Sequence, residues 1–475
     1  MLYLGQTDWS LDTLRPAPKS SGFFDQAMGV LDFFTHLRLL LETVFFSNHR
    51  EVVQWLRAQK PDLVLVHLFS MNVIPVLEEE GLPFVQYFAA SPVPLFFEDD
   101  LDVLCRYPTK DLPMPVDKLK ASFLHRVLNQ ALCRATAVAM EVGVSQMRPL
   151  FAKYDSPPPK RGRLPIVDVD HGLVLGGPPL NYPIALPPGW HPVGLMQKPK
   201  QQTAALPEAL GQWLDASTRP VLYVSTGTKY AFAPDTVPPF LEAVHELIHG
   251  RGLRVLWSLR APEQEKLRKL GLFDFEEHDA DLRLEEWTPQ PELLKHPAVK
   301  IFLSHCGWGG TSDAIGAGVP ILAHPGGAEQ HLNAERLVHA GVGILLEPGF
   351  GNLVAATSAL LDDAAAEGTY ARNSREAGEA LAGLGGFEKA MSLLEAVAEG
   401  RPMSPDPQVI AKMGSGPDAD FFLRTPQTAE KWACLGLFAA AAGLVLGAAG
   451  LVLLGAWKAI RLLRPAKAPL KKKLA

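Results

Sequence analysis

The sequence contains few cysteines and no cluster of basic residues in its main body, and both features narrow the classes of protein to which it can belong. It has 4 cysteines in 475 residues, none in a CxxC pair, so it lacks the ligand spacing of a zinc or iron–sulfur site. Their wide separation leaves a disulfide open but shows no disulfide framework: they are Cys105, Cys133, Cys306 and Cys434. The formal net charge is −6 and the charge is dispersed, so nothing indicates a nucleic-acid partner.

The first residues lack the pattern of a secretory signal peptide, because no basic segment precedes an apolar one there. The C-terminal region does carry a long apolar segment: the 25 residues from Ala433 to Trp457 contain no charge. That length crosses about 30 Å of hydrocarbon at about 1.5 Å per residue. We therefore expect a membrane span at Ala433–Trp457, with Trp432 and Trp457 as interfacial aromatics.

Basic residues are frequent in the tail, residues 458–475, and scarce just before the expected span. The positive-inside rule then places the tail in the cytosol and the main body on the other side of the membrane. The last four residues, KKLA, resemble the dilysine signal that retrieves type I membrane proteins to the endoplasmic reticulum. We expect a single-pass protein of that membrane, although a tail that only binds lipid headgroups gives the same topology. Gly443 and Gly447 form a GxxxG spacing, which leaves a homo-oligomer open.

Strand-like apolar runs alternate with helical segments along most of the chain. "KPDLVLVH" and "LPFVQYFA" enclose a helical segment that ends at Gly81, which is the pattern of a βαβ unit in a parallel sheet. A second series begins at Arg219 with "RPVLYVSTGT" and continues with "LRVLWSLR", "LRLEEW", "VKIFLSHC" and "VPILAHP". We expect two α/β domains, then a linker, the span and the tail; their ranges are 1–193, 200–400, 401–432, 433–457 and 458–475.

A glycine-rich segment, "HCGWGGTSDAIGAGVP" (His305–Pro320), follows the strand-like run "VKIFLS". In parallel α/β sheets, ligands bind beyond the carboxyl ends of the strands. Amides at a helix N-terminus make an anion site there, and we expect a helix to begin near Thr311. The glycines, Gly307, Gly309 and Gly310, would let phosphate oxygens approach the backbone, with His305 as an added donor. Such a loop alone is as often only a tight turn between strand and helix.

Other polar and aromatic residues are expected at the same edge of the sheet. Ser225 and Gly227 lie in a turn at the end of "VLYVS", and Trp287 and Gln290 follow the strand-like "LRLEE". After the next strand come Glu329 and Gln330. An aromatic face, an anion cradle and an acid–amide pair suit a base, a diphosphate and a sugar respectively.

The segment from Trp287 to Asn333, "WTPQPELLKHPAVKIFLSHCGWGGTSDAIGAGVPILAHPGGAEQHLN", closely resembles the signature of UDP-sugar-dependent glycosyltransferases of the UDP-glucuronosyl and UDP-glucosyl transferase type. Looser similarity extends over "VLYVSTGT", "KPDLVLVH" and the C-terminal span. The resemblance implies the GT-B fold, in which two Rossmann-like domains face each other across the active site. It also implies inverting transfer of a sugar from a UDP-sugar to a hydroxyl of a lipophilic small molecule, without metal or other cofactor. DxD spacings occur at Asp168 and Asp279, and such a motif binds metal in another class of glycosyltransferase. They carry little weight, because the same spacing also occurs by chance at Asp100 and Asp418.

The resemblance also implies roles for single residues. Trp287 would stack on uracil, Gln290 would lie against the base and ribose, and His305 would contact the diphosphate. The backbone of Gly307, Gly309 and Gly310 would surround the diphosphate, beside the phosphate loop that holds Ser225 and Gly227.

Three further roles concern the ribose and the sugar. Asp313 stands where the family usually has a glutamate for the ribose hydroxyls, so a shorter acid must reach further. Trp308 would line the sugar pocket, and Glu329 with Gln330 would hold the transferred sugar.

The general base is the part of the resemblance that this sequence does not supply. In the family it is a histidine after the first strand, but here the first recognisable strand is already "DLVLVH". The catalytic base is therefore unassigned, with His67 as a weak candidate whose bland alternative is a packed histidine at a strand end. Either the chain is a truncated form of an enzyme, or it is a membrane-anchored UDP-sugar-binding or partner subunit without catalysis.

Overall fold

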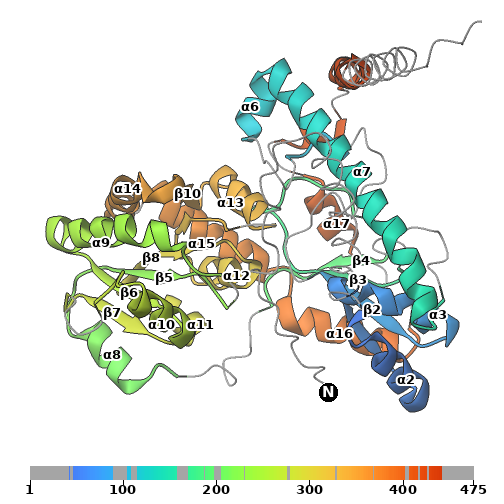
Figure 1. Cartoon of the computed structure of the whole chain (residues 1–475), viewed down its shortest axis with the longest axis horizontal. Coiled ribbons are helices and arrows are strands. Elements are labelled where there is room, and N and C mark those ends of the chain that lie inside the picture. The colour runs from blue at the N-terminus through green and yellow to red at the C-terminus, as the bar shows by residue number, and fades with distance from the viewer. Residues whose placement is uncertain are drawn as a thin grey trace, which may run out of the picture.

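A computed structural model of the chain shows two α/β domains side by side (Figure 1). It describes residues 42, 46–88, 104–108, 115–157, 169–186, 188–196, 205–228, 230–274, 279–326, 329–366, 368–401, 406–415, 418–424 and 427–440.

The first domain contains a parallel four-stranded sheet in the order β1-β2-β3-β4. The strands are β1 (Val64–His67), β2 (Phe84–Phe88), β3 (Gly172–Val174) and β4 (Trp190–Pro192). The helices of this part are α2 (His49–Gln59), η2 (Leu68–Val73), α3 (Ile74–Glu79), α6 (Val116–Ala121) and the long α7 (Phe123–Lys153). Among the described strands β1 lies at the edge of the sheet, and its Leu65 is 48% exposed.

The second domain contains a parallel six-stranded sheet in the order β10-β9-β8-β5-β6-β7. The strands are β5 (Val221–Ser225), β6 (Arg254–Ser258), β7 (Leu282–Glu285), β8 (Val299–Ser304), β9 (Ile321–Ala323) and β10 (Gly343–Leu345). The helices are α8 (Glu208–Asp215), α9 (Val237–Arg251), α10 (Ala261–Lys269), α11 (Gln290–Leu294), α12 (Trp308–Gly316), α13 (Glu329–His339), α14 (Leu353–Ala365) and α15 (Thr369–Ala382), with the short turns η4 (Pro234–Thr236) and η5 (Pro348–Phe350). Numbered along the chain, this is the doubly wound order 3-2-1-4-5-6, whose direction of winding reverses between β5 and β8.

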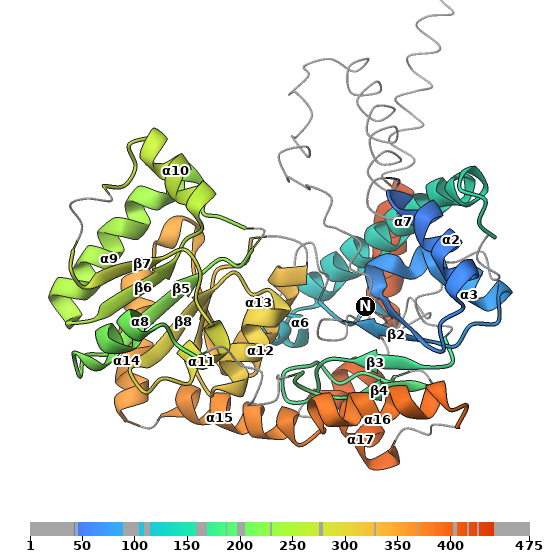
Figure 2. The same cartoon turned by 90° about the horizontal axis from the view of Figure 1, so that it is seen from below.

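The final helices return to the first domain (Figure 2). Helix α16 (Gly386–Ala398) covers the four-stranded sheet, where Leu393 packs with Val85 and Leu173 in one buried cluster. The return lies beside the earlier crossing between the domains, because the Gly386 amide donates to the Val193 carbonyl at 2.8 Å. The second domain was expected to continue to residue 400. Helix α15 still packs on α12 and α14 of that domain, whereas α16 packs on β2 of the first.

Residues 401–432 were expected to be a linker, yet their described parts are packed. They include α17 (Pro407–Met413) and η6 (Asp420–Arg424). Asp418 is 3% exposed and joins both domains, since it pairs with Lys120 at 2.6 Å and with His339 at 2.9 Å. Phe422 stacks on Tyr107 with ring centroids 4.9 Å apart. This polar segment therefore holds the two domains together.

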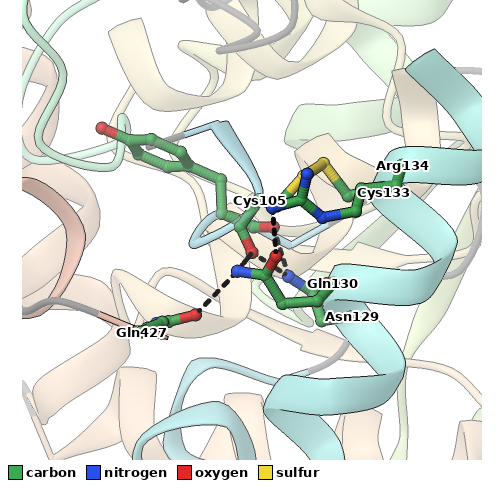
Figure 3. The surroundings of a disulfide bond; sticks show 7 residues. Cys105, Asn129, Gln130, Cys133, Arg134 and Gln427 are labelled. Carbon is green, nitrogen blue, oxygen red and sulfur yellow. Dashed lines mark hydrogen bonds between the residues drawn. A yellow bond between two sulfur atoms is a disulfide. The ribbon is translucent and has the colours of Figure 1, made fainter. Parts of the chain in front are cut away.

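One disulfide joins Cys105 to Cys133 of α7, with their Cα atoms 5.4 Å apart (Figure 3). The Asn129 amide donates to the Cys105 carbonyl at 2.9 Å, and Gln130 donates to Gln427 at 3.3 Å. The sequence left a disulfide open, and the structure identifies this pair; Cys306 and Cys434 are buried free thiols.

The expected membrane span begins within a helix that covers residues 428–440, and its remaining part, 441–457, lies outside the described residues, as do Gly443, Gly447 and the tail. Within the described part of the chain, no helix combines the length and the apolar character needed to cross a membrane.

Candidate donor-binding site

The loops after β5 and β8 meet at the point where the winding of the six-stranded sheet reverses. Ser225, the last residue of β5, pairs with Ser304, the last residue of β8. The turn Ser225–Gly227 and the segment His305–Gly307 therefore start from neighbouring strand ends. This is the position at which doubly wound sheets bind ligands.

The His305 ring lies between two glycines. A Cβ on Gly227 would be 2.6 Å from Cε1 of His305, and a Cβ on Gly307 would overlap Nε2 of the same ring. Gly227 also has φ of +73°, which side chains rarely adopt. Both glycines make room for the imidazole, whereas a Cβ on Gly309 would meet nothing within 4 Å. The expectation that all these glycines serve ligand approach is thus refined: two of them seat His305.

Burial keeps His305 neutral. Desolvation lowers the pKa of this imidazole, and a hydrogen bond to the Ser225 backbone opposes the shift only in part. Nδ1 is buried and has no hydrogen-bond partner among the described residues. A neutral imidazole has a single N–H, so His305 can donate it either to the Ser225 carbonyl or, with a ligand bound, to a phosphate oxygen.

Helix α12 begins at Trp308, three positions before the expected start at Thr311. Gly307 is the N-cap, and the Thr311 amide already donates to its carbonyl at 3.0 Å. The amides of Trp308, Gly309 and Gly310 are therefore those of the first turn, which have no acceptor inside the helix. Together with the helix dipole they form an anion site next to His305.

The Trp308 side chain itself is only 8% exposed and packs in the core cluster with Cys306 and Ile315. Most of its surface is thus used in packing, which leaves little for the sugar contact that the resemblance implies.

The loop before α12 is held by contacts with β8 and α13 that the sequence did not reveal. Cys306 has φ of +64°, its amide donates to Ser304 Oγ at 3.1 Å, and its carbonyl accepts from Asn333 of α13 at 2.9 Å. Burial raises the pKa of the Cys306 thiol, so it is not a nucleophile at neutral pH. Its role is to shape the turn that carries His305.

Trp287 and Gln290 lie beside this site, after β7. Trp287 is 66% exposed and offers a free aromatic face. The Gln290 amide donates to Asp313 Oδ2 at 2.8 Å, and its carbonyl oxygen accepts from the Tyr223 hydroxyl at 3.2 Å. Tyr223 also shares a hydrogen bond with Thr288 at 2.8 Å, so both ends of the Gln290 amide are oriented. Tyr223 is 1% exposed and was missed because a tyrosine within an apolar strand is usually core.

Glu329 and Gln330 begin α13, after β9, which neighbours β8 in the sheet. Both are half-buried, and Gln330 Oε1 accepts from the Gly326 amide at 2.9 Å. Tyr230, from the loop after β5, donates to the Gly326 carbonyl. The expected acid–amide pair thus stands at the same edge of the sheet as His305.

His67 lies in the other domain, at the end of β1. It pairs in register with Tyr87, and the two rings meet edge to face with centroids 4.9 Å apart. Burial lowers the pKa of His67. A base role for it remains a prediction, and the contact with Tyr87 is also what a packed strand-end histidine makes.

Together these loops offer an exposed aromatic face, an anion site with a neutral histidine, and two acid–amide pairs. Such a set fits a molecule that combines a flat ring, a diphosphate and a hydroxyl-rich sugar.

Comparison with known sequences agrees with this geometry. Residues 169–365 match the family model described as UDP-glucoronosyl and UDP-glucosyl transferase. The chain is 27% identical over 301 residues to UDP-glycosyltransferase CGT of Oryza sativa subsp. indica, covering 57% of this chain and 58% of that protein. It is 37% identical over 153 residues to UDP-glucose flavonoid 3-O-glucosyltransferase 6 of Fragaria ananassa, covering 30% of each. The matched part thus spans less than two thirds of either relative.

Solved structures share the two-domain architecture. The glycotransferase of kitacinnamycin superposes with a TM-score of 0.52 at 16% identity, covering 77% of this chain and 82% of that one. UDP-glucose: anthocyanidin 3-O-glucosyltransferase in complex with UDP gives a TM-score of 0.51 at 19% identity, covering 76% and 80%. At this identity the likeness concerns the fold alone, and it supports the GT-B arrangement expected from the sequence.

Proposed function

Over residues 169–365 the chain belongs to the UDP-glycosyltransferase family, and from this premise we propose that it transfers a sugar from a UDP-sugar to a hydroxyl of a lipophilic small molecule with inversion. The observation that carries the donor half of this proposal is the position of His305. Its neutral ring is seated between Gly227 and Gly307 where the winding of the sheet reverses, next to the first-turn amides of α12.

In the proposed donor complex the uracil stacks on Trp287. Gln290 and Asp313 hold each other by a hydrogen bond and present their remaining polar atoms to the base and ribose. The diphosphate lies at the N-terminus of α12 with His305 as a further donor, and Glu329 with Gln330 contacts the sugar.

The reaction is a displacement at the anomeric carbon. The acceptor oxygen forms the new bond as the bond to the diphosphate breaks, and the electron pair leaves on UDP. First-turn amides of α12 stabilise the charge that develops on the leaving phosphate. The hydroxyl proton goes to a general base in the first domain, for which His67 is the candidate on the described strands. The protein's own groups suffice for this chemistry, and we propose no metal or other cofactor in it.

We further propose that the body of the protein lies in the lumen of the endoplasmic reticulum, anchored by the span at 433–457 with a cytosolic tail. The Cys105–Cys133 disulfide supports this location, because disulfides persist mainly in oxidising compartments.

The test separates binding from catalysis. The full chain, purified in detergent, is incubated with UDP-glucose or UDP-glucuronate and a panel of lipophilic alcohols and phenols, while UDP binding is measured by calorimetry. We expect UDP binding without added metal and a β-glycoside as product. UDP binding without product from any acceptor would support the non-catalytic binding subunit instead, and no UDP binding would contradict both functions.

A further inference from the structure

A group of potential metal ligands lies in the second domain, away from the donor site. It consists of His245, His249 and Asp279, whose ligand atoms all lie within 4.8 Å of one another. The two histidines are one helical turn apart on α9, with ring centroids 4.3 Å apart, and Asp279 precedes β7. His249 Nε2 and Asp279 Oδ2 are 2.8 Å apart.

The group lies at the edge of the sheet opposite the donor site. Strand β5 ends at the donor site, and α9 runs back from there, so its last turns, with His249, reach the amino edge of the sheet. Asp279 stands before Leu282, the first residue of β7, and is therefore at that same edge. This group is consequently separate from the machinery of sugar transfer.

The backbone that carries the three side chains is held in place. Helix α9 is anchored by Val244, Leu247 and Ile248, all buried in the core of the sheet. This leaves the His245–His249 face outward, where both histidines are exposed. The Asp281 amide donates to Asp279 Oδ1 at 2.9 Å, while Oδ2 faces His249.

Two imidazoles and one carboxylate are a ligand set that Zn²⁺ accepts. Ligands about 2.05 Å from a tetrahedral zinc are about 3.3 Å from one another. The ligand atoms here lie within 4.8 Å of one another, so any pair must approach by at most about 1.5 Å to reach that geometry, with water as the fourth ligand. We propose that His245, His249 and Asp279 bind Zn²⁺ or a similar divalent transition-metal ion and thereby tie the end of α9 to the start of the edge strand β7.

A simple His–carboxylate hydrogen bond is the alternative, and the chain supplies a matched control for it. His296 and Asp215 form such a pair at 3.2 Å, but no third ligand is grouped with them among the described residues. A pair of this kind does not bind zinc tightly, so His296→Ala should leave zinc binding intact.

The experiment uses the full chain in detergent, stripped with a chelator and titrated with Zn²⁺ at pH 7.5. We expect one zinc ion bound per chain at this site and, at 100 times the Kd, a rise in Tm of about 3 °C if the whole chain unfolds as one unit or about 6 °C if the second domain unfolds on its own. Asp279→Asn should weaken binding at least about tenfold, by analogy with the loss of supporting groups around metals. The double variant His245→Ala/His249→Ala should lose the site. Co²⁺ should give the visible absorption of a four-coordinate site in the wild type and in His296→Ala only.

Because both histidines are exposed, the double variant should keep the wild-type Tm in the absence of metal, which shows that it folds. Unchanged zinc stoichiometry and Tm rise in this variant would overturn the proposal, as would the absence of zinc binding by the wild type. UDP affinity should be the same with and without zinc, which distinguishes this site from the donor site.

Discussion

The two parallel sheets of this protein differ in what their loops are built to do. In the six-stranded sheet the turns after β5 and β8 are shaped around one side chain, His305. A side chain at either Gly227 or Gly307 would clash with its ring. In the four-stranded sheet the corresponding strand end carries His67, which packs against Tyr87 on the neighbouring strand. The first domain is held instead by long-range ties, namely the disulfide and the returning segment that follows α15. Changes in the first domain should therefore alter stability, and changes in the second should alter donor affinity.

The largest effect on this contrast should come from the disulfide. Cys105 and Cys133 are 28 residues apart. Replacing both by alanine removes the cross-link from the unfolded chain and should lower the free energy of unfolding by about 3–4 kcal/mol. Donor affinity should stay the same, because the loop belongs to the first domain. Denaturant unfolding and UDP calorimetry measure the two quantities, with the free Cys434→Ala as the control of smaller effect. If UDP affinity fell together with stability, the proposed division between the domains would be wrong.

The buried His191 of β4 should make stability depend on pH. Desolvation, aided by His171 and Lys389, lowers the pKa of His191 to about 4. The unfolded chain then binds the extra proton first, so the contribution of His191 is present above about pH 6.5 and is lost as the pH falls to 4. The stability of the wild type relative to His191→Gln should fall by about 3 kcal/mol between pH 7 and pH 4. A difference between the two proteins that does not change with pH would contradict this.

Gly227→Ala should show the opposite behaviour, with its main effect on the ligand. The new Cβ would lie 2.6 Å from the His305 ring at a φ of +73°, so the ring must move or the turn must strain. We expect UDP binding to weaken by about 2–4 kcal/mol. Gly309→Ala is the matched control, since its Cβ meets nothing within 4 Å, and it should bind UDP within about threefold of the wild type. Calorimetry on both variants decides whether seating His305 is the reason for the glycine.

The smallest of these effects should be that of Trp287→Ala. Loss of a stacked aromatic ring should weaken UDP binding by about 1–3 kcal/mol, while Trp287→Phe retains most of the affinity. Trp55, which is 37% exposed on α2 of the first domain, provides a control substitution that should not change UDP affinity. Equal UDP affinity in Trp287→Ala and the wild type would remove this residue from the site.

The fold class and the grouping of the site loops could be predicted because both depend on local pattern. The five short strand-like runs expected in the second domain are strands, and the ends of parallel strands must meet at one edge. Strand β10 was not predicted, and β3 and β4 were missed because the sequences GLV and WHP lack the pattern of an isolated strand. They exist because β3 pairs with β2 and β4 pairs with β3, which is a property of the folded chain.

Within the site, the sequence predicted where the residues lie but only in part what each side chain does. The placement of Trp308 in the core and the start of α12 at that residue depend on packing against distant elements. Tyr223 orients Gln290 through its hydroxyl, but within an apolar strand the sequence predicts only a core residue at this position. Residues 401–432 looked like a linker because the segment is polar, but its Asp418 contacts Lys120 of the first domain and His339 of the second.

The double crossing between the domains has a mechanical consequence. The chain passes from one domain to the other after β4 and again between α15 and α16, and the two passes are joined by the Gly386–Val193 hydrogen bond. Glycines with positive φ stand at both: Gly194 at 73°, Gly385 at 99° and Gly386 at 51°. Two neighbouring crossings restrict how the domains can rotate relative to each other, because hinge motions are absorbed at the few residues where the chain passes between domains. In the proposed reaction, an acceptor bound to the first domain would approach the donor by rotation about these two crossings.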